Sequence, residues 1–577
     1  MKYLGNRNRI PRLIGLTSIF LAITSLTEAS AAFDIKISVD QTKSYVRSNP
    51  NLIGLNVGWP GNGGALFADG QVEMRLFQLM TGLANGPLRY PAGEWADSYQ
   101  WMDAVGSPRP NTMYHPSAVS DAKAYEKINF GTDEFRAYCR SLACTPVFQI
   151  NMHQGNDDEV VARANRWLEH IATHPSDSIG PLPKVEYWEL GNEPYLKGSP
   201  DSNEWASSYL YLSKEEFATR AAKVMDAMQK KHSELTKNST SKLKFILPFA
   251  LDSWRGEYCK NPDPNYSYCS DSSTVVGSQL GFGKALIDRL ARSNQLSNIH
   301  ALSLHYYMPL VGAIQANPPD DVTFYWATMA GTATVEKNIQ KVRDFWTSNV
   351  GTSTPMPRLS ITEFNSLYTT TSGLRQEGFV ASQTGAMYVM DMIRLLAYQP
   401  DVDMAMLWSA SQNGYFGAID FFDVAPNYPT YVRPHYKALQ MGRDLLQKDA
   451  LVVPLNVEAP TYDGYTTRVG ASHPYPKMPL ATAAATITGK TVRVLVLNKD
   501  IGSDGRVQLT VDGKLATSVA GTVVKAGKNS QFSTSNQKLI SIVENIPVAT
   551  DSSANGKTSF SWLMPPTSFG LITFTLQ

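Results

Sequence analysis

The sequence has no long run of charges of one sign, and it has few cysteines. Lys and Arg total 52 against 51 Asp and Glu, so the chain lacks the basic surface that a polyanion would require. Spacings of the Cys-x-x-Cys or His-Glu-x-x-His kind, which indicate metal sites, are also missing. There is no Gly-x-Ser-x-Gly motif of the serine hydrolases either. We therefore expect no nucleic-acid partner, no metal and no other cofactor.

Long hydrophobic runs are equally scarce, and the one near the N-terminus has the features of an export signal. Basic residues within the first twelve positions precede the apolar run from Leu13 to Leu26, which ends in the small residues Ala29-Ser30-Ala31. This run is too short and too interrupted by Thr and Ser for a membrane span, and no later segment is long enough. The sequence predicts a signal peptide over 1–31 and a secreted protein, extracellular or periplasmic, that is not membrane-bound after signal removal.

Only four cysteines are present, and an exported chain favours their oxidation. Four cysteines allow three disulfide connectivities. The simplest arrangement pairs the near neighbours in sequence, Cys139 with Cys144 and Cys259 with Cys269.

Short apolar or β-branched runs alternate with amphipathic stretches along most of the chain, which is the pattern of parallel βα units. The expected strands are Asn51 to Trp59, Pro87 to Ala92, Thr145 to Met152, Val185 to Asn192, Leu243 to Ala250, Ile299 to Tyr307, Arg358 to Phe364 and Val402 to Ser409. The helices expected between them include Asp133 to Arg140, Asp158 to Thr173, Lys214 to Lys231, Thr334 to Asn349 and Gly378 to Ala397. These units predict an α/β fold, a (β/α)8 TIM barrel over 49–443.

The remaining C-terminal part has short alternating segments separated by Gly, Asn and Ser, which predict an appended antiparallel β-sandwich over 444–577. Its expected strands are Thr491 to Asn498, Arg506 to Val511, Lys538 to Val543, Ser559 to Leu563 and Gly570 to Leu576. The alternating stretch Phe33 to Val39, within an N-terminal segment 32–48, is expected to add a strand to the same sandwich.

Polar and aromatic residues gather where six of the expected barrel strands end. They are Arg89, Asn151 and His153, Asn192 and Glu193, His305 and Tyr307, Glu363 and Asn365, and Trp408. Active sites of such barrels lie at the carboxyl ends of the strands, so this clustering favours a functional site over ordinary loop beginnings.

Two of these residues are carboxylic acids on the fourth and seventh strands. Glu193 follows Gly191-Asn192, and Glu363 follows Ser360-Ile361-Thr362. Either Glu alone would be read as a helix-start residue that interacts with the helix dipole. Cleavage of a glycosidic bond requires a proton donor and a second carboxylate on opposite sides of the bond, so the pair points to a glycoside hydrolase.

The motifs around these residues resemble the large clan of retaining glycosidases built on this barrel, and within it glycoside hydrolase family 51, the α-L-arabinofuranosidases. The matching motifs are Gly191-Asn192-Glu193-Pro194, Leu88-Arg89-Tyr90-Pro91-Ala92-Gly93, Tyr99-Gln100-Trp101, Ala104-Val105-Gly106 and Phe130-Gly131-Thr132-Asp133-Glu134-Phe135. The resemblance covers nearly all of the mature chain, including the β-sandwich.

The resemblance implies a role for each site residue. Glu193 would be the acid/base and Glu363 the nucleophile, with the pKa of the acid raised relative to that of the nucleophile. Asn192 would hydrogen-bond the sugar 2-hydroxyl, and Arg89 and Tyr307 would hold the nucleophile ionised. His305 would line the same wall, and Trp408 would form the aromatic floor of the sugar subsite.

Sugar recognition departs from the family pattern. Asn56 occupies the end of the first strand, where family 51 has a Glu that contacts the sugar ring, and Glu94-Trp95 replaces Asn-Phe in the second-strand loop. His305-Tyr306-Tyr307 also appears in heparanase-like relatives, the second resemblance. Glu94 and Trp95 are therefore candidate substrate-binding residues.

Two other functions stay open at this stage. A β-glycosidase or endoglycanase of the same clan would act on xylose, glucose or uronic acid units with the same two Glu. A carbohydrate-binding protein without turnover would need no opposed carboxylates. Linkage, exo or endo action and oligomeric state are not determined by the sequence, and the expected partner is an oligo- or polysaccharide.

Overall fold

The structure is a computed structural model that describes residues 31–577 apart from 41, 60–65, 69–70, 84–85, 114–124, 197–211, 252–280, 309–320, 368–376, 413–415, 421–430, 466–473, 513–515, 528–540 and 553–556. Nearly all of the predicted signal peptide and the predicted Cys259–Cys269 pair lie outside the described residues. No helix among the described residues has both the length and the apolar composition needed to cross a bilayer.

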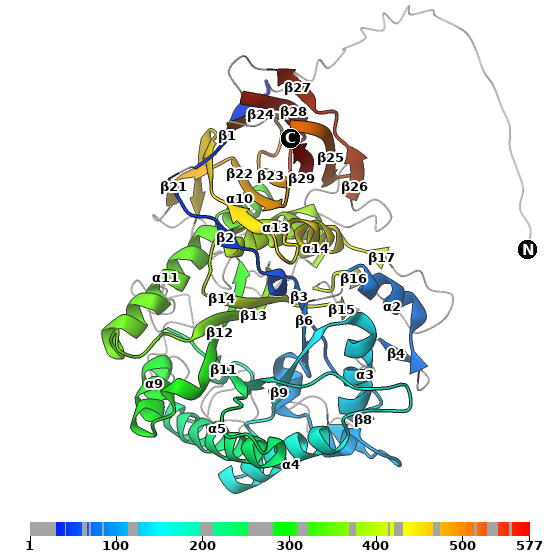
Figure 1. Cartoon of the computed structure of the whole chain (residues 1–577), viewed down its shortest axis with the longest axis vertical. Coiled ribbons are helices and arrows are strands. Elements are labelled where there is room, and N and C mark those ends of the chain that lie inside the picture. Colours follow the sequence, from blue (N-terminus) through cyan, green and yellow to red (C-terminus); the bar gives the residue numbers. More distant parts are fainter. Residues whose placement is uncertain are drawn as a thin grey trace, which may run out of the picture.

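Eight parallel strands close into a barrel in chain order, which confirms the predicted fold (Figure 1). The strands are β3 (Gly54–Asn56), β6 (Pro87–Tyr90), β9 (Thr145–Ile150), β10 (Tyr187–Leu190), β11 (Lys244–Pro248), β12 (Ile299–Met308), β13 (Arg358–Ser366) and β14 (Val402–Leu407). The helices that follow them are α2 (Met74–Thr81), α3 (Thr132–Leu142), α4 (Asp157–Thr173), α5 (Lys214–Thr236), α9 (Phe282–Arg292), α11 (Gly331–Asn349), α13 (Gln383–Ala397) and α14 (Pro434–Leu445).

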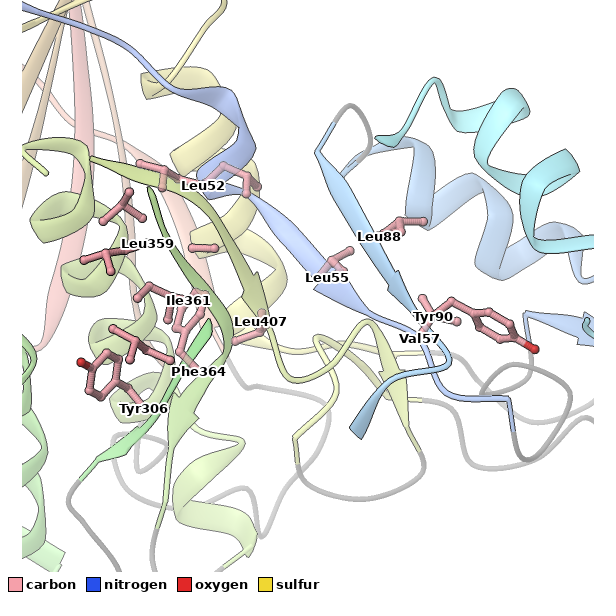
Figure 2. Packing of buried hydrophobic residues seen from close by; sticks show 14 of the residues in the cluster. Leu52, Leu55, Val57, Leu88, Tyr90, Tyr306, Leu359, Ile361, Phe364 and Leu407 are labelled. Carbon is pink, nitrogen blue, oxygen red and sulfur yellow. The ribbon is translucent and has the colours of Figure 1, made fainter. Parts of the chain in front are cut away.

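Alternation along the strands separates two environments. Outward-facing side chains such as Leu359 and Ile361 of β13 and Leu407 of β14 pack together in the layer between the strands and the helices (Figure 2). Inward-facing residues fill the barrel in layers, as expected for this fold. The lowest interior layer is apolar and comprises Val147, Tyr187, Ile246, Ala301, Met404 and Met406.

The next interior layer is polar although it is buried. Its members hydrogen-bond across the barrel and are Asn56, Arg89, Gln149, Glu189, Ser303 and Thr362. Buried polar groups are stable only when they are paired, so this layer is a connected network. It forms the floor on which the residues of the barrel mouth stand.

The second unit is a sandwich of two sheets. One has the order β19-β1-β24-β28-β27 and the other the order β2-β18-β22-β23-β29-β25-β26. Their bounds are β1 (Phe33–Val39), β2 (Val46–Arg47), β18 (Leu451–Val453), β19 (Leu455–Glu458), β22 (Ala481–Thr488), β23 (Thr491–Asn498), β24 (Gly505–Asp512), β25 (Ala516–Ala526), β26 (Ser541–Asn545), β27 (Ala549–Ser552), β28 (Lys557–Met564) and β29 (Ser568–Leu576).

The N-terminal strand β1 lies in this sandwich, where it pairs antiparallel with β19 and parallel with β24. The other pairs in these two sheets are antiparallel. Ile35 and Ile37 of β1 enter a separate apolar core with Val507, Leu509 and Phe560. From β1 onward the chain thus runs from the sandwich into the barrel and back to the sandwich, with α13 and α14 between the two units in Figure 1.

Candidate active site

Glu193 and Glu363 face each other at the mouth of the barrel. One carboxylate oxygen of each residue and a ring nitrogen of His305 all lie within 4.8 Å of one another. The side chain of Glu193 is 23% exposed, whereas that of Glu363 is 6% exposed. The pair therefore combines a solvent-accessible carboxyl group with a buried one.

A bulge in β13 brings Glu363 to this position. Leu304 pairs with Ile361 and His305 pairs with Glu363, so Thr362 is an extra residue opposite β12. A bulge breaks the alternation of side chains along a strand. As a result, Thr362 and Glu363 both make hydrogen bonds inside the barrel, although neighbours in a regular strand would point to opposite faces.

Both oxygens of Glu363 accept hydrogen bonds. Arg89 Nη1 donates to Oε1 at 2.8 Å, and the Tyr307 hydroxyl donates to Oε2 at 2.6 Å. Burial raises the pKa of Glu363 above its usual value, while His305, Arg89 and Tyr307 act in the opposite direction. The expectation that Arg89 and Tyr307 hold this carboxyl group ionised left out burial, whose effect on the pKa is larger than theirs.

His305 connects the two carboxyl groups. Its Nδ1 lies 2.8 Å from Glu193 Oε1 and 3.6 Å from Glu363 Oε2. Burial would lower the pKa of His305, but the charges of Glu363 and Glu193 raise it above its usual value. The imidazole therefore holds its proton more strongly than an isolated histidine does.

Arg89 is fully buried and is shared among several partners. Besides Glu363, it donates to Asn56 Oδ1 at 3.0 Å, to Asn192 Oδ1 at 3.0 Å and to the carboxylate of Glu189. Burial lowers the pKa of Arg89, but Glu189 and Glu363 raise it more strongly. Arg89 is thus a fixed positive charge beneath Glu193 and Glu363.

Glu189 is a third carboxylate in the site and is fully buried, and it was not among the residues chosen from the sequence. Its Oε1 accepts from Ser303 Oγ at 2.8 Å and from Thr362 Oγ1 at 3.0 Å, and its Oε2 accepts from Arg89. The available signal was a charged residue inside the otherwise apolar run Tyr187-Trp188-Glu189-Leu190. A charge with 0% exposure requires partners of this kind.

Asn56 does not reach the mouth of the site. Its amide nitrogen lies 2.9 to 3.2 Å from the carbonyl oxygens of Thr362, Met406 and Leu407, and its oxygen accepts from Arg89. The side chain is 1% exposed. Asn56 therefore supports Arg89 in the floor, and its side chain is committed to these partners.

Asn192 is buried beside Arg89. Its Oδ1 accepts from Arg89 Nη2 and, at 3.2 Å, from Gln149 Nε2. The oxygen of the amide is therefore committed to the protein. Any bond to a sugar hydroxyl has to come from the amide nitrogen.

Two tryptophans form one wall of the mouth. The rings of Trp95 and Trp408 lie 5.5 Å apart with their planes tilted by 32°, and both are partly exposed. Gly93 has φ +69°, and a Cβ at this position would lie 2.3 Å from the Trp408 ring. Glu94, between these residues, is partly exposed. Partly exposed aromatic rings of this kind stack against sugar faces.

Three other residues predicted from the sequence, Asn151, His153 and Asn365, make contacts with neighbouring protein groups. Asn151 Nδ2 donates to Gln154 at 2.9 Å, and His153 Nε2 lies 3.5 Å from Asp97 Oδ1, so both support neighbouring loops. Asn365 donates to the Trp408 carbonyl at 2.6 Å.

A disulfide joins Cys139 to Cys144, between the end of α3 and the start of β9.

The donor set of Glu193, His305 and Glu363 has the spacing of a cation site. However, both oxygens of Glu363 already accept from Arg89 and Tyr307. The buried guanidinium at 2.8 Å would repel a divalent ion. The arrangement fits an opposed pair of carboxyl groups better than a metal centre.

Comparison with known sequences gives short matches to arabinofuranosidases. Probable alpha-L-arabinofuranosidase C of Aspergillus fumigatus is 26% identical over 219 residues, which covers 34% of this chain and 40% of that protein. Intracellular exo-alpha-L-arabinofuranosidase of Bacteroides ovatus is 30% identical over 129 residues, 20% of this chain and 24% of that protein. The chain thus matches less than half the length of these relatives, and no family model matches it.

Comparison with solved structures covers almost the whole chain. The alpha-L-arabinofuranosidase of Thermotoga maritima, solved as an arabinose complex, has a TM-score of 0.67 at 18% identity and covers 95% of this chain and 100% of its own. A family 51 alpha-L-arabinofuranosidase of Bifidobacterium longum has a TM-score of 0.68 at 16% identity, covering 94% and 100%. A family 44 xyloglucanase of Paenibacillus polymyxa has a TM-score of 0.53 at 15% identity, covering 95% and 100%. The comparisons confirm the resemblance to glycoside hydrolase family 51 that the sequence motifs indicate.

Proposed function

We propose that the chain is a retaining glycoside hydrolase, α-L-arabinofuranosidase-like, whose barrel over 49–443 carries the reaction. The observation that carries this proposal is the opposed pair Glu193 and Glu363, with oxygens within 4.8 Å of each other at the barrel mouth. Carboxyl groups about 5 to 5.5 Å apart suit a double displacement with retention of configuration. An inverting enzyme needs a wider separation, because a water molecule must fit between its catalytic base and the sugar.

The residues divide the reaction between them. Glu363, held by Arg89 and Tyr307, attacks the anomeric carbon while Glu193 transfers its proton to the leaving oxygen. Glu193, then ionised, takes a proton from the water that hydrolyses the glycosyl-enzyme. His305, 2.8 Å from Glu193, stabilises the charge that remains on Glu193 between the two steps.

The substrate class follows the named relatives, which are arabinofuranosidases. One observation favours a second candidate, an endoglycanase of the same clan: Asn56 is committed to the barrel floor and offers nothing to an arabinofuranose ring. A bifunctional glucanase-xylanase from a metagenome library also has this fold, with a TM-score of 0.55 at 14% identity. The expected substrates are oligo- or polysaccharides in either case.

A panel of nitrophenyl glycosides tests the activity and the sugar together. We expect release of nitrophenol from the α-L-arabinofuranoside, and a loss of at least about 10³-fold in kcat/KM for Glu193→Ala and Glu363→Ala. Glu186→Ala, at an exposed Glu just before β10, is the matched control and should be active. Proton NMR should show that the sugar first released has the same anomeric configuration as the substrate.

Binding of oligosaccharides by the wild type without release of product from any glycoside would favour a non-catalytic carbohydrate-binding protein. Activity confined to xylosides, glucosides or linear glycans would favour the endoglycanase. Inverted configuration in the first product would rule out the double displacement.

We further propose that the protein is exported and loses residues 1–31. Support comes from the basic start, the apolar run and the small residues at its end. Expression of the full chain with fractionation and N-terminal sequencing checks this, and a protein that keeps Met1 in the cytoplasm would contradict it.

A further inference from the structure

We propose that Glu189 is a positioning residue that sets both members of the catalytic pair from below, through Arg89 on one side and Thr362 on the other. The inference rests on the proposed hydrolase function. The hydrogen bonds of Glu189 go to Arg89, Ser303 and Thr362, so its influence on Glu193 and Glu363 passes through these partners.

The first connection runs to the nucleophile. Arg89 donates its Nε to Glu189 and its Nη1 to Glu363, so one planar guanidinium joins the two carboxylates. All three side chains are buried, with exposures of 0% for Arg89 and Glu189 and 6% for Glu363. A guanidinium fixed at Nε presents Nη1 in one direction, which fixes the Oε1 oxygen of Glu363.

The second connection runs to the acid/base. Thr362 Oγ1 lies 3.0 Å from Glu189 Oε1 and 2.9 Å from His305 Nε2, while His305 Nδ1 lies 2.8 Å from Glu193. Thr362 Oγ1 also contacts Ser303 Oγ, which itself donates to Glu189, and a carboxylate only accepts, so the hydroxyl protons of Thr362 and Ser303 serve Glu189 directly or through one another. Thr362 Oγ1 must then accept a hydrogen bond from His305, which places a proton on Nε2. Nδ1 of the same ring is the atom in contact with Glu193.

The balance of charge gives Glu189 a second effect. The charged and titratable groups around this network are Arg89 from β6, His305 and Tyr307 from β12, Glu363 from β13 and Glu193 after β10. Glu189 offsets the positive charge of Arg89. Without it, the site would be more positive, and every acidic group facing Arg89 would ionise at lower pH.

Glu189→Gln therefore has a defined signature. We expect kcat/KM to fall about 10- to 100-fold, as is usual for partners that orient working groups. Both limbs of its pH profile should move to lower pH by about one unit, because a buried charge has been removed. Glu189→Asp keeps the negative charge. The two limbs of its pH profile should therefore lie at the same pH as those of the wild type, even if its kcat/KM is lower.

Thr362 provides the matched comparison. Thr362→Val keeps the shape and the Glu189 charge but removes the hydroxyl, so kcat/KM should fall without any shift of the limbs to lower pH. Thr362→Ser restores the hydroxyl and should recover most of the rate. A purely structural role for Glu189 predicts equal losses for Gln and Asp with unmoved limbs, and that result would overturn the inference.

The tautomer of His305 gives a measurement that needs neither activity nor a variant of Glu189. With ¹⁵N-labelled histidine, His305 is one of nine histidines, and its two ring-nitrogen signals can be assigned by their loss in His305→Asn. We expect Nε2 to be protonated at neutral pH in the wild type. A bare Nε2 would overturn the inference, whereas a wild type inactive on all glycosides would refute only the proposed function.

Discussion

Gly93 is the residue whose replacement tests the aromatic wall most directly. Its φ of +69° is strained for any other residue, and a Cβ would meet the Trp408 ring at 2.3 Å. Gly93→Ala should push Trp408 from its place beside Trp95, raise KM about tenfold or more and destabilise the fold by about 1–3 kcal/mol. Gly106→Ala is the control, because it has the similar φ of +71° with nothing within 4 Å.

Steady-state kinetics on the nitrophenyl substrate together with thermal unfolding separate the two effects. If KM rises for Gly93→Ala but not for Gly106→Ala, the steric contact with Trp408 is the cause. Equal changes in both variants would assign the effect to backbone strain instead.

Burial of Glu363 makes a prediction for the pH profile. Because burial raises the pKa of Glu363, the proposed nucleophile, kcat/KM should decline at a pH above the ordinary Glu value of about 4.3 as the pH is lowered. Tyr307→Phe removes a donor that lowers this pKa, so its acidic limb should move to still higher pH. A limb that stays fixed or falls in Tyr307→Phe would contradict this account of the carboxylate.

Much of the site could be predicted at the level of single residues, because strand ends in a barrel converge on one place. Glu193, Glu363, Arg89, His305 and Tyr307 do converge, although their catalytic roles stay predictions. Thr362 was missed because alternation points it away from a site that contains Glu363, and a bulge overrides alternation. Bulges depend on the pairing of two strands and leave no mark in one sequence.

Among the elements, helices were easier to locate than the edges of the barrel strands. The expected helix Asp158 to Thr173 corresponds to α4, Asp157–Thr173, since its capping residues and apolar period are local signals. The expected strand Asn51 to Trp59 shortens to β3, Gly54–Asn56, because strand ends depend on the neighbour with which they pair. The sandwich strands β22 and β25 were not predicted, since β22 is the Ala- and Thr-rich segment Ala481–Thr488.

The start of α4 offers a test at this scale. Asn156 Oδ1 accepts from the Glu159 amide at 3.0 Å, and Glu159 Oε2 accepts from the Asn156 amide at 2.8 Å, which completes a capping box. Asn156→Ala should lower the free energy of unfolding by about 0.5–2 kcal/mol, whereas Asn156→Asp should be nearly neutral. Chemical denaturation followed by circular dichroism measures both, and an Asn156→Ala variant as stable as the wild type would show that the cap contributes nothing.

The whole molecule depends on a buried ion pair between the barrel and the sandwich. Asp391 of α13 accepts from Lys499 Nζ at 2.8 Å and from Thr482 of β22 at 2.9 Å, and the side chains of Asp391 and Lys499 are both 1% exposed. Burial alone would raise the pKa of Asp391, but Arg394 and Lys499 hold it well below its usual range. The carboxylate is therefore charged at neutral pH.

Removal of this carboxylate should destabilise the chain strongly. Asp391→Asn leaves Lys499 buried without its partner and should cost about 3–5 kcal/mol, measured as lower thermal stability and faster proteolysis between the units. The double variant Asp391→Asn with Lys499→Met should recover part of the loss. Glu544→Gln breaks the more exposed pair with Lys525 and should change little, so similar losses in both would argue against a special role for the interface.

His435 makes the stability of the whole chain depend on pH. It lies on α14 against Gly385 of α13 with 0% exposure, and neither ring nitrogen bonds to any residue that the structure describes. Burial, with help from Arg433, lowers its pKa to about 3. In the unfolded chain the imidazole takes up a proton near pH 6.5.

The sign of the effect follows from these two values. Above about pH 6.5 the imidazole is neutral in both states, and its contribution to stability is fully present. As the pH falls from there toward about 3, only the unfolded chain binds the proton, so stability is lost by up to about 1.4 kcal/mol per pH unit. The slope of unfolding free energy between pH 6.5 and 4.5 should therefore be shallower in His435→Gln than in the wild type, with exposed His174→Gln unchanged; equal slopes in all three proteins would show that the histidine is solvated or protonated in the folded state.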